Sequence, residues 1–288
     1  MRAVLGIDAA WTLTHPSGVA LAVQMGTAWR LVAVSPSYQG FHALAAQGPA
    51  SELRPSGSRP DAKELLATSR KLCGLPVDLV AIDMPLARSR ITGRRASDNA
   101  VSSAYGARKC GTHTPSSARP GVISDELKEG FGEAGYPLQT QSISTPGLIE
   151  VYPHPALVEL AGAPERLRYK VSKARGYWPK SDAAERKKLL LREWTGIITR
   201  LETQITGVAS ALPTLPADAR GAELKAFEDM LDAVVCAWVA ICALEERATP
   251  FGDQNSAIWV PNRRQCSNPS QAVNRRRPGP RSRLRIGG

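Results

Sequence analysis

The sequence lacks the features that would place it in a membrane or direct it to secretion. It contains no uninterrupted run of about 18 apolar residues, which a transmembrane helix requires. Its first residues carry neither the basic flank nor the long apolar segment of a signal peptide. The five cysteines form no CxxC pair, which argues against a disulfide framework and against a zinc ribbon. We therefore expect a cytoplasmic protein that does not contact a membrane.

Acidic residues are absent from residues 262–288, which hold eight arginines together with prolines and glycines. Without those arginines the net charge of +11 falls to +3, so most of the basic character belongs to this segment. Such a composition is typical of a disordered tail, because it offers little apolar surface to bury. The tail is expected to be either an arm that binds phosphate groups or a solubilising extension.

The chain begins with short apolar segments. Residues 3–7, 18–23 and 29–34 are joined by polar turns, which predicts an antiparallel meander of three strands. Residues 35–60 are rich in Ser, Gly and Pro and are expected to form a loop. Asp61 is placed to cap a helix that ends near Leu72. An apolar run at 77–87 then predicts a strand that is buried on both faces of a sheet.

The remainder of the chain is mostly helical in pattern. We expect a short helix capped by Ser97, helices across 156–207 and 222–247, and otherwise broken structure between 88 and 146. Residues 147–155 include a further strand, and residues 257–261 are expected to add a late edge strand. The predicted fold class is α/β, a mixed β-sheet of three antiparallel strands followed by parallel strands, flanked by helices. The predicted domain is 1–261, with a helical insert at about 156–221, followed by the tail at 262–288.

Two of the predicted strands end on a carboxylate. Asp8 and Asp83 each close an apolar run, and burying an unpaired charge is costly. If the two strands are parallel neighbours, both carboxylates lie at the same end of the sheet, about 5 Å apart in the pairing direction. Each aspartate could instead cap a turn, and Asp83 precedes Met84-Pro85, which favours an Asx-type turn.

Further acids lie on the late helix and on the strand at 147–155. Asp229 and Asp232 are three residues apart and share a helix face that continues as apolar residues. Like charges in a partly dry site require a cation, and hard oxygen ligands suit Mg²⁺ or Mn²⁺. We therefore expect one or two divalent cations to be bound by Asp8, Asp83, Asp232 and either Glu150 or Asp229. Such cations could activate water for phosphodiester hydrolysis. For Glu150 the alternative is an ion pair with a basic residue.

Basic residues between the strands and the late helix are candidates for contacts with nucleic acid. They alternate with aromatic residues, as in sites that stack bases and bind phosphates: Tyr169, Lys170, Lys173, Arg175, Tyr177 and Trp178. A solvated helix end would have the same pattern. His154, between two prolines, is expected to be structural rather than a general base.

Five segments of the chain resemble, in order, successive blocks of the domain of unknown function 429 family. They span about residues 4–261 and read "GIDAAWT…PSGVAL", "VAIDMPLA", "GRRASDNAV", "LIEVYPHPALVEL" and "DMLDAVVCAWVA". That family is described as predicted RNase H-like nucleases. An early strand aspartate followed by a late "DxxDA" helix is also similar to RuvC-type Holliday junction resolvases, which share the fold.

The resemblance implies an RNase H-like mixed sheet and a nuclease that depends on Mg²⁺ or Mn²⁺, with DNA and RNA both open as substrates. Asp8 matches the first-strand metal ligand, and Asp232 matches the acid of the last helix, with Asp229 as its neighbour. Asp83 lies where the fold places its second acid. Arg95 matches another block, in which an arginine could hold a phosphate.

Two other classes of function remain as alternatives. One is a non-catalytic scaffold of the same fold that binds nucleic acid or a protein partner, for which the acids need not converge. The other, less favoured, is an ATPase related to actin or sugar kinases. Such an ATPase needs a glycine-rich phosphate loop after its first strand. Here that turn reads "AAWTLTHPSG", with Gly18 only at its end.

Overall fold

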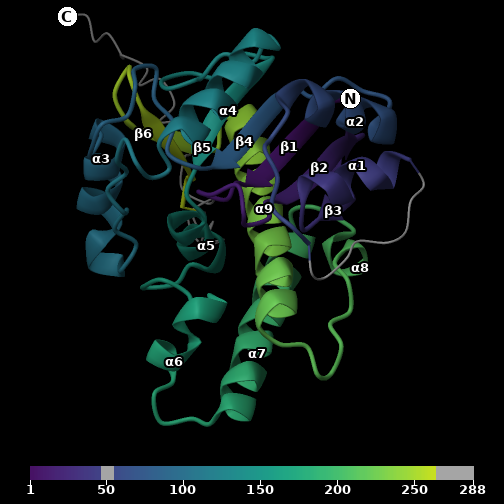
Figure 1. Ribbon diagram of the computed structural model, residues 1–288, viewed down its shortest axis with the longest axis vertical. Helices are drawn as coiled ribbons and strands as arrows, with labels where there is room; N and C mark the ends of the chain where they lie inside the picture. The colour runs from purple at the N-terminus through teal and green to yellow at the C-terminus, as the bar shows by residue number, and fades with distance from the viewer. Residues whose placement is uncertain (47–54, 264–288) are drawn as a thin grey trace, which may run out of the picture.

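A mixed sheet forms the centre of the computed structural model, which describes residues 1–46 and 55–263 (Figure 1). In chain order its strands are β1 (Ala3–Asp8), β2 (Gly18–Met25), β3 (Ala28–Ser35), β4 (Leu79–Asp83), β5 (Gly147–Val151), β6 (Ala248–Gly252) and β7 (Ala257–Pro261). Across the sheet the order is β3-β2-β1-β4-β5-β7-β6. β1, β2 and β3 are antiparallel, whereas β4, β5 and β7 run parallel to β1. The predicted α/β class with its mixed sheet is therefore confirmed.

The edge of the sheet differs from the prediction. β7 was expected at the edge, but it lies between β5 and β6, with β6 antiparallel to it on the outside. β6 reads "ATPFG", too short and too rich in Pro and Gly to suggest a strand. A proline lacks the N–H that a central strand must donate, so Pro250 is suited to an edge strand. The strand that was missed is therefore the one that ends this side of the sheet.

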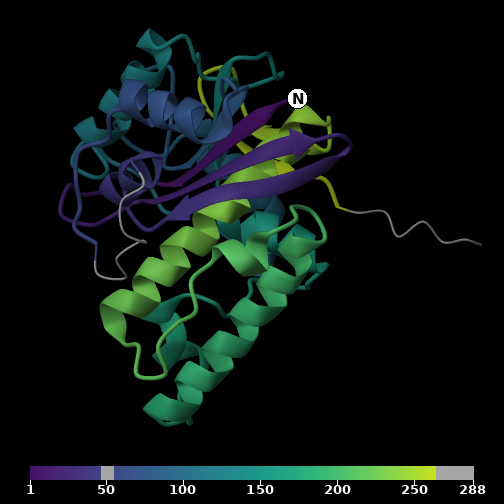
Figure 2. The same cartoon turned by 90° about the vertical axis from the view of Figure 1, so that its right-hand side faces the viewer.

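Helices cover both faces of the sheet (Figure 2). The α-helices are α1 (Tyr38–Ala45), α2 (Ala62–Cys73), α3 (Ala96–Tyr105), α4 (Val122–Glu133), α5 (Pro153–Ala161), α6 (Ala174–Tyr177), α7 (Ala183–Glu202), α8 (Val208–Ala211) and α9 (Gly221–Leu244). One apolar core lies between the sheet and α5, α7 and α9, and a second lies between the sheet and α1, α2 and α4. Strand side chains alternate between these two cores, as the pleat requires.

Two helices occupy segments that were expected to be irregular. α1 lies within the predicted loop at 35–60, where the Ser37 hydroxyl accepts a hydrogen bond from the Gly40 N–H as the N-cap. α4 lies in the segment expected to be broken, and it contains two glycines. Its Leu127 and Phe131 side chains are buried against the sheet, and this packing outweighs the low helix propensity of glycine.

Other boundaries agree more closely. α2 is capped by Asp61, whose carboxylate accepts a 2.9 Å hydrogen bond from the Glu64 N–H, as predicted. α3 begins at Ala96 with Arg95 as its N-cap residue, so Ser97 lies inside the helix instead of capping it.

The segment between β5 and α9 is helical, and Figure 1 shows α6 and the far end of α7 extending well away from the sheet. It includes the short 3₁₀ helix η2 (Val171–Lys173) just before α6, whereas another, η1 (Gly106–Arg108), follows α3 earlier in the chain. Among residues 1–46 and 55–263, no helix combines the length and the apolar character needed to cross a membrane. The predicted basic tail lies outside the described residues from 264 onward.

Candidate functional site

Asp8 and Asp83 lie side by side at the carboxyl ends of two central strands. The parallel register of β1 and β4 pairs Asp8 directly with Asp83. Val4 and Leu79, which share a face with these aspartates by alternation, pack in the core beneath α9. Among the hydrogen bonds of the described residues, none joins a backbone N–H to either carboxylate. Both carboxylates therefore point toward α9, and neither acts as a turn cap.

The two carboxylates are held in an environment that disfavours their charge. Burial, followed by the neighbouring Asp229 carboxylate, raises the pKa of Asp8 to about 7. Burial and then the charge of Asp8 raise the pKa of Asp83 well above its ordinary value. The raised pKa values mean that the ionised forms of both acids are unfavourable here. Each acid therefore keeps its proton unless a cation binds the pair.

The pair opens into a pocket of about 590 Å³. Acidic groups are joined in its lining by basic and aromatic ones: Asp8, Asp83, Asp229, Trp11, His15, His113, Arg119 and Lys225. The Arg119 guanidinium lies 5.8 Å from the centre of the Trp11 ring. Trp11 carries no signal of this role in the sequence apart from its place in the turn after β1, close to Asp8.

Asp232 is fully buried, and each of its two oxygens contacts another protein group. The Tyr169 hydroxyl donates a 2.9 Å hydrogen bond to its Oδ1 atom, and the Lys170 ammonium binds its Oδ2 atom. Lys170 also lies 3.3 Å from Glu228, whose other oxygen accepts a 2.5 Å hydrogen bond from the Val171 N–H. We call residues 169–171 the strap. Its three residues attach to α9 through these two carboxylates.

Asp229 is likewise paired with a lysine. The Lys225 ammonium, one helical turn earlier on α9, binds the Asp229 carboxylate and lies 3.3 Å from Glu228. Lys225 and Glu228 were missed from the sequence, although Lys225 lies four residues before Asp229 and Glu228 lies four residues before Asp232, spacings that place each pair on one helix face. Both predicted ligands on α9 are thus engaged by ammonium groups, while Asp8 and Asp83 are not.

Glu150 does not join the other acids, because it lies on the opposite face of the sheet. The register pairs it with Ile82, one residue before Asp83, and successive side chains of a strand point to opposite faces. Its two oxygens accept hydrogen bonds of 2.5 and 2.7 Å from Arg95 and one of 2.7 Å from the Leu86 N–H. The ion pair with a basic residue, which the sequence left open, is therefore the arrangement found.

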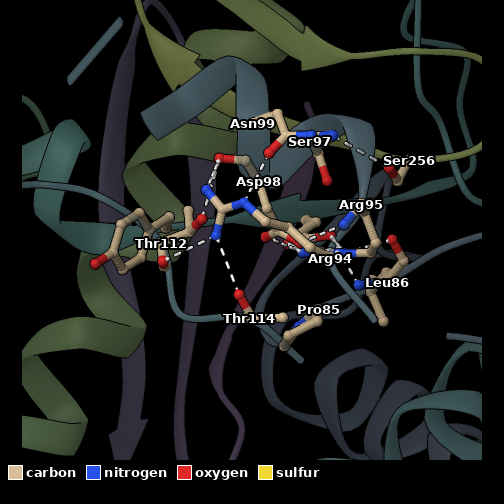
Figure 3. Close-up of polar contacts among 12 residues, drawn as sticks. Pro85, Leu86, Arg94, Arg95, Ser97, Asp98, Asn99, Thr112, Thr114 and Ser256 are labelled. Carbon is tan, nitrogen blue, oxygen red and sulfur yellow. Dashed lines mark hydrogen bonds and ion pairs between the residues drawn. The ribbon is translucent and has the colours of Figure 1, made fainter. Parts of the chain in front are cut away.

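Arg95 is buried in this ion pair and is not available to a phosphate. Figure 3 shows Arg95 beside Leu86 and Asp98, its guanidinium also donates to Glu150, and only 7% of the residue is exposed. A guanidinium has five N–H groups, and the contacts to Glu150, Asp98 and the Leu86 carbonyl use all of its nitrogens. The prediction that Arg95 contacts nucleic acid is thus not supported by its position.

Of the other residues predicted to contact nucleic acid, one is turned into the protein and two are exposed. Lys170 points inward to Asp232, whereas Lys173 and Arg175 are exposed on η2 and α6. Neither of the exposed residues lines the pocket. His154 is buried between the rings of Tyr152 and Tyr169, and burial lowers its pKa well below the ordinary value. Its place agrees with the structural role expected from the sequence.

Among the described residues, the pair formed by Asp8 and Asp83 fits a divalent cation. Within the described residues, no group of three or more His, Cys, Asp or Glu side chains could hold a metal ion. Mg²⁺, however, is commonly bound by one or two carboxylates, with waters and substrate phosphates as its other ligands. A pair of carboxylates that opens into a pocket meets that requirement. A site built from all four predicted ligands does not form, because Asp229 and Asp232 are paired with lysines.

Comparison with known proteins gives one match. A family model described as "Protein of unknown function (DUF429)" matches residues 6–256, a range that includes both strand aspartates, the strap and α9. No curated protein and no solved structure matches the chain.

Proposed function

From the site of this chain, which belongs to the DUF429 family of proteins of unknown function, we propose that the protein is a metal-dependent phosphodiesterase that hydrolyses nucleic acid. One observation carries this proposal. Asp8 and Asp83 are adjacent at the ends of parallel strands, form no ion pair with another described residue, and open into a pocket with basic groups at its rim.

The carboxylate pair is the proposed binding site for Mg²⁺ or Mn²⁺. Burial makes the charge of Asp8 and Asp83 costly, and binding of a cation removes that cost while releasing their protons. When bound, the metal would supply Lewis acidity and lower the pKa of a coordinated water. The protein itself contributes the orientation of the two acids, which the β1–β4 register fixes.

The rim of the pocket supports a nucleic acid as the substrate. Arg119 presents a guanidinium, whose planar fork matches a phosphate, and Lys225 adds a second positive charge. Trp11 is partly exposed beside Arg119 and offers a flat face on which a base can stack. A substrate that carries both a phosphate and a base would use all three residues.

A non-catalytic scaffold is the second candidate, and one observation favours it. Asp232 is paired with Lys170 of the strap and Asp229 with Lys225 of the same helix, as they would be if both acids had only a structural role. In that case the protein would bind nucleic acid through its basic groups without a metal ion. The two candidates therefore differ in whether a divalent cation binds and whether the strand is cut.

Cleavage assays on labelled single-stranded, duplex, hybrid and branched substrates distinguish these candidates. With Mg²⁺ or Mn²⁺ we expect cutting that is lost in Asp8→Asn and in Asp83→Asn. The loss should exceed about 100-fold, because even groups that only support metal ligands cost 10- to 100-fold when removed. Asp218→Asn, at an exposed position outside the pocket, is the matched control and should cut like the parent.

Two results would change the assignment. Cutting by Asp8→Asn at the parent rate would remove Asp8 from the site. Tight binding of a substrate by the parent without cutting, and without any dependence on divalent cations, would favour the scaffold.

A further inference from the structure

The acids of the site meet two lysines that the chain itself supplies. Five carboxylates from β1, β4 and α9 gather here, and two ammonium groups lie among them: Asp8, Asp83, Glu228, Asp229 and Asp232, with Lys170 and Lys225. Lys170 contacts Asp232 and Glu228 directly, and its charge also acts on Asp8 and Asp83. If every acid is ionised, the positive charges offset only part of the negative charge.

Lys170 is held as a fixed charge and not as a mobile surface side chain. Only 17% of its side chain is exposed, and its Nζ atom lies 5.2 Å from the centre of the Tyr169 ring. The strap around it is fastened on both sides, because the Trp194 indole N–H donates a 2.8 Å hydrogen bond to the Tyr169 carbonyl and the Val171 N–H binds Glu228. The ammonium therefore has one defined position beside α9.

Lys225 differs from Lys170 in each of these respects. About half of its side chain is exposed, it lines the pocket, and its partners Glu228 and Asp229 are neighbours on the same helix. Pairs of this kind form readily on a helix surface and also separate readily. Lys225 can therefore turn toward a substrate phosphate, whereas Lys170 cannot leave without breaking the contact between the strap and α9.

A second divalent cation on α9 would have to take the place of Lys170. Both oxygens of Asp232 are already used, one by the Tyr169 hydroxyl and one by the Lys170 ammonium. Glu228, one helical turn before Asp232, lies 3.3 Å from the Lys170 ammonium through one oxygen and accepts from the Val171 N–H with the other. A metal ion bound to these two acids would be repelled by the ammonium that both already contact, unless the ammonium is displaced.

We propose that the Lys170 ammonium occupies the place of a second cation, so that the protein binds a single divalent cation, at Asp8 and Asp83. Lys170 is then a positioning residue, which fixes Asp232 and supplies a permanent positive charge behind the pair. This inference rests on the proposed function, because it assumes that the aspartate pair binds a metal. Beyond the proposed function, the inference specifies how many divalent cations the protein binds and names Lys170 as the residue that sets this number.

Counting Mn²⁺ ions bound to the full chain tests the inference without an activity assay. Electron paramagnetic resonance of free Mn²⁺ in a titration gives the number of ions bound per chain. We expect one ion for the parent and two for Lys170→Met, because the substitution leaves Asp232 without an ammonium and leaves Glu228 with that of Lys225 alone. Lys170→Arg keeps a cation in place and should bind one ion.

Lys187→Met is the matched control for the loss of a structural lysine. Lys187 of α7 donates hydrogen bonds to the Ala217 and Ala219 carbonyls, in the segment just before α9. Neither of these two bonds involves a carboxylate. Its removal should leave the count at one. A second ion in this variant would show that general loosening creates the extra site, and that result would overturn the inference.

The remaining outcomes are also decisive. Two ions bound by the parent would overturn the inference and leave the proposed function standing, and this measurement does not depend on whether any variant folds. A single ion bound by Lys170→Met, with the circular dichroism of the parent, would also overturn it. No bound ion in the parent would overturn the proposed function together with the inference.

Discussion

At the scale of single residues, a charged side chain can be buried where protein groups satisfy its hydrogen bonds. The Arg95 guanidinium lies between Asp98 and Glu150, with side-chain exposures of 5% or less for all three residues. Burial raises the pKa of Glu150 to about 7 even though Arg95 opposes the shift. Charges buried to this degree are tolerated only as a complete set, because each removed partner leaves the others without compensation.

We therefore predict that Arg95→Met lowers the free energy of unfolding by about 3–5 kcal/mol, because it leaves two carboxylates buried without their cation. Urea unfolding followed by circular dichroism measures the change. Arg59→Met is the control, since Arg59 and Glu126 form an exposed ion pair, and pairs of that kind contribute about 1 kcal/mol or less. Equal loss of stability in the two variants would contradict the prediction.

At the scale of elements, the contact between β1 and α9 brings the acids of the helix to the ends of the strands. Gly6 of β1 touches the backbone of α9, and a Cβ atom there would lie 2.2 Å from the Ala233 carbonyl oxygen and 2.4 Å from the Ala237 nitrogen. Gly18, opposite Asp8 on β2, approaches the Asp229 carbonyl in the same way. These glycines allow helix and sheet to meet backbone to backbone, which places Asp229 beside Asp8.

Gly6→Ala should therefore destabilise the protein by about 1–3 kcal/mol or more, because the added methyl group meets backbone atoms that cannot rotate away. Thermal unfolding measures the effect. Gly132→Ala is the matched control, since Gly132 lies on an exposed part of α4 with no atom within 4 Å of an added Cβ. That substitution should stabilise the helix by up to about 1 kcal/mol. A Gly6 variant as stable as the Gly132 variant would contradict this account of the contact.

At the scale of the whole molecule, the folded state binds more protons than the unfolded chain at mildly acidic pH. Burial raises the pKa of Asp8 to about 7 and that of Asp232 to about 6, and it raises the pKa of Asp83 as well. In an unfolded chain these carboxyl groups lose their protons near pH 4. Between these values the folded protein keeps protons that the unfolded chain releases.

The free energy of unfolding should therefore fall as the pH rises from about 4 to about 7 in the absence of divalent cations. The sign follows from linkage, because stability decreases with pH wherever the native state holds more protons. Added Mg²⁺ should restore stability at pH 8 more than at pH 5, since the metal competes with protons for the same carboxylates. Thermal unfolding across this pH range provides the test. Stability that rises steadily from pH 5 to pH 7.5 without metal would contradict it.

The sequence by itself located the first five strands and the two acids at the ends of β1 and β4. Apolar runs that end in polar turns locate β1 to β5, because a strand is recognised from residues close together in the chain. Each of β1 and β4 ends on a carboxylate in the sequence, and their pairing as parallel neighbours, which the sequence left as a condition, places Asp8 beside Asp83. The register also explains Glu150. It lies opposite Ile82, so the alternation of the pleat directs it to the face away from Asp83.

Only the tertiary structure decided which partner each remaining charge found. Lys170 looks like a surface lysine in the sequence, yet it binds Asp232, 62 residues away, because the strap is held between α7 and α9. Arg95 likewise finds Glu150, 55 residues away, and is lost to any phosphate. Charges of this kind are attracted to any opposite charge within a few ångströms, without regard to separation along the chain. The packing of elements distant in sequence selects the pair, and local pattern contains no record of that selection.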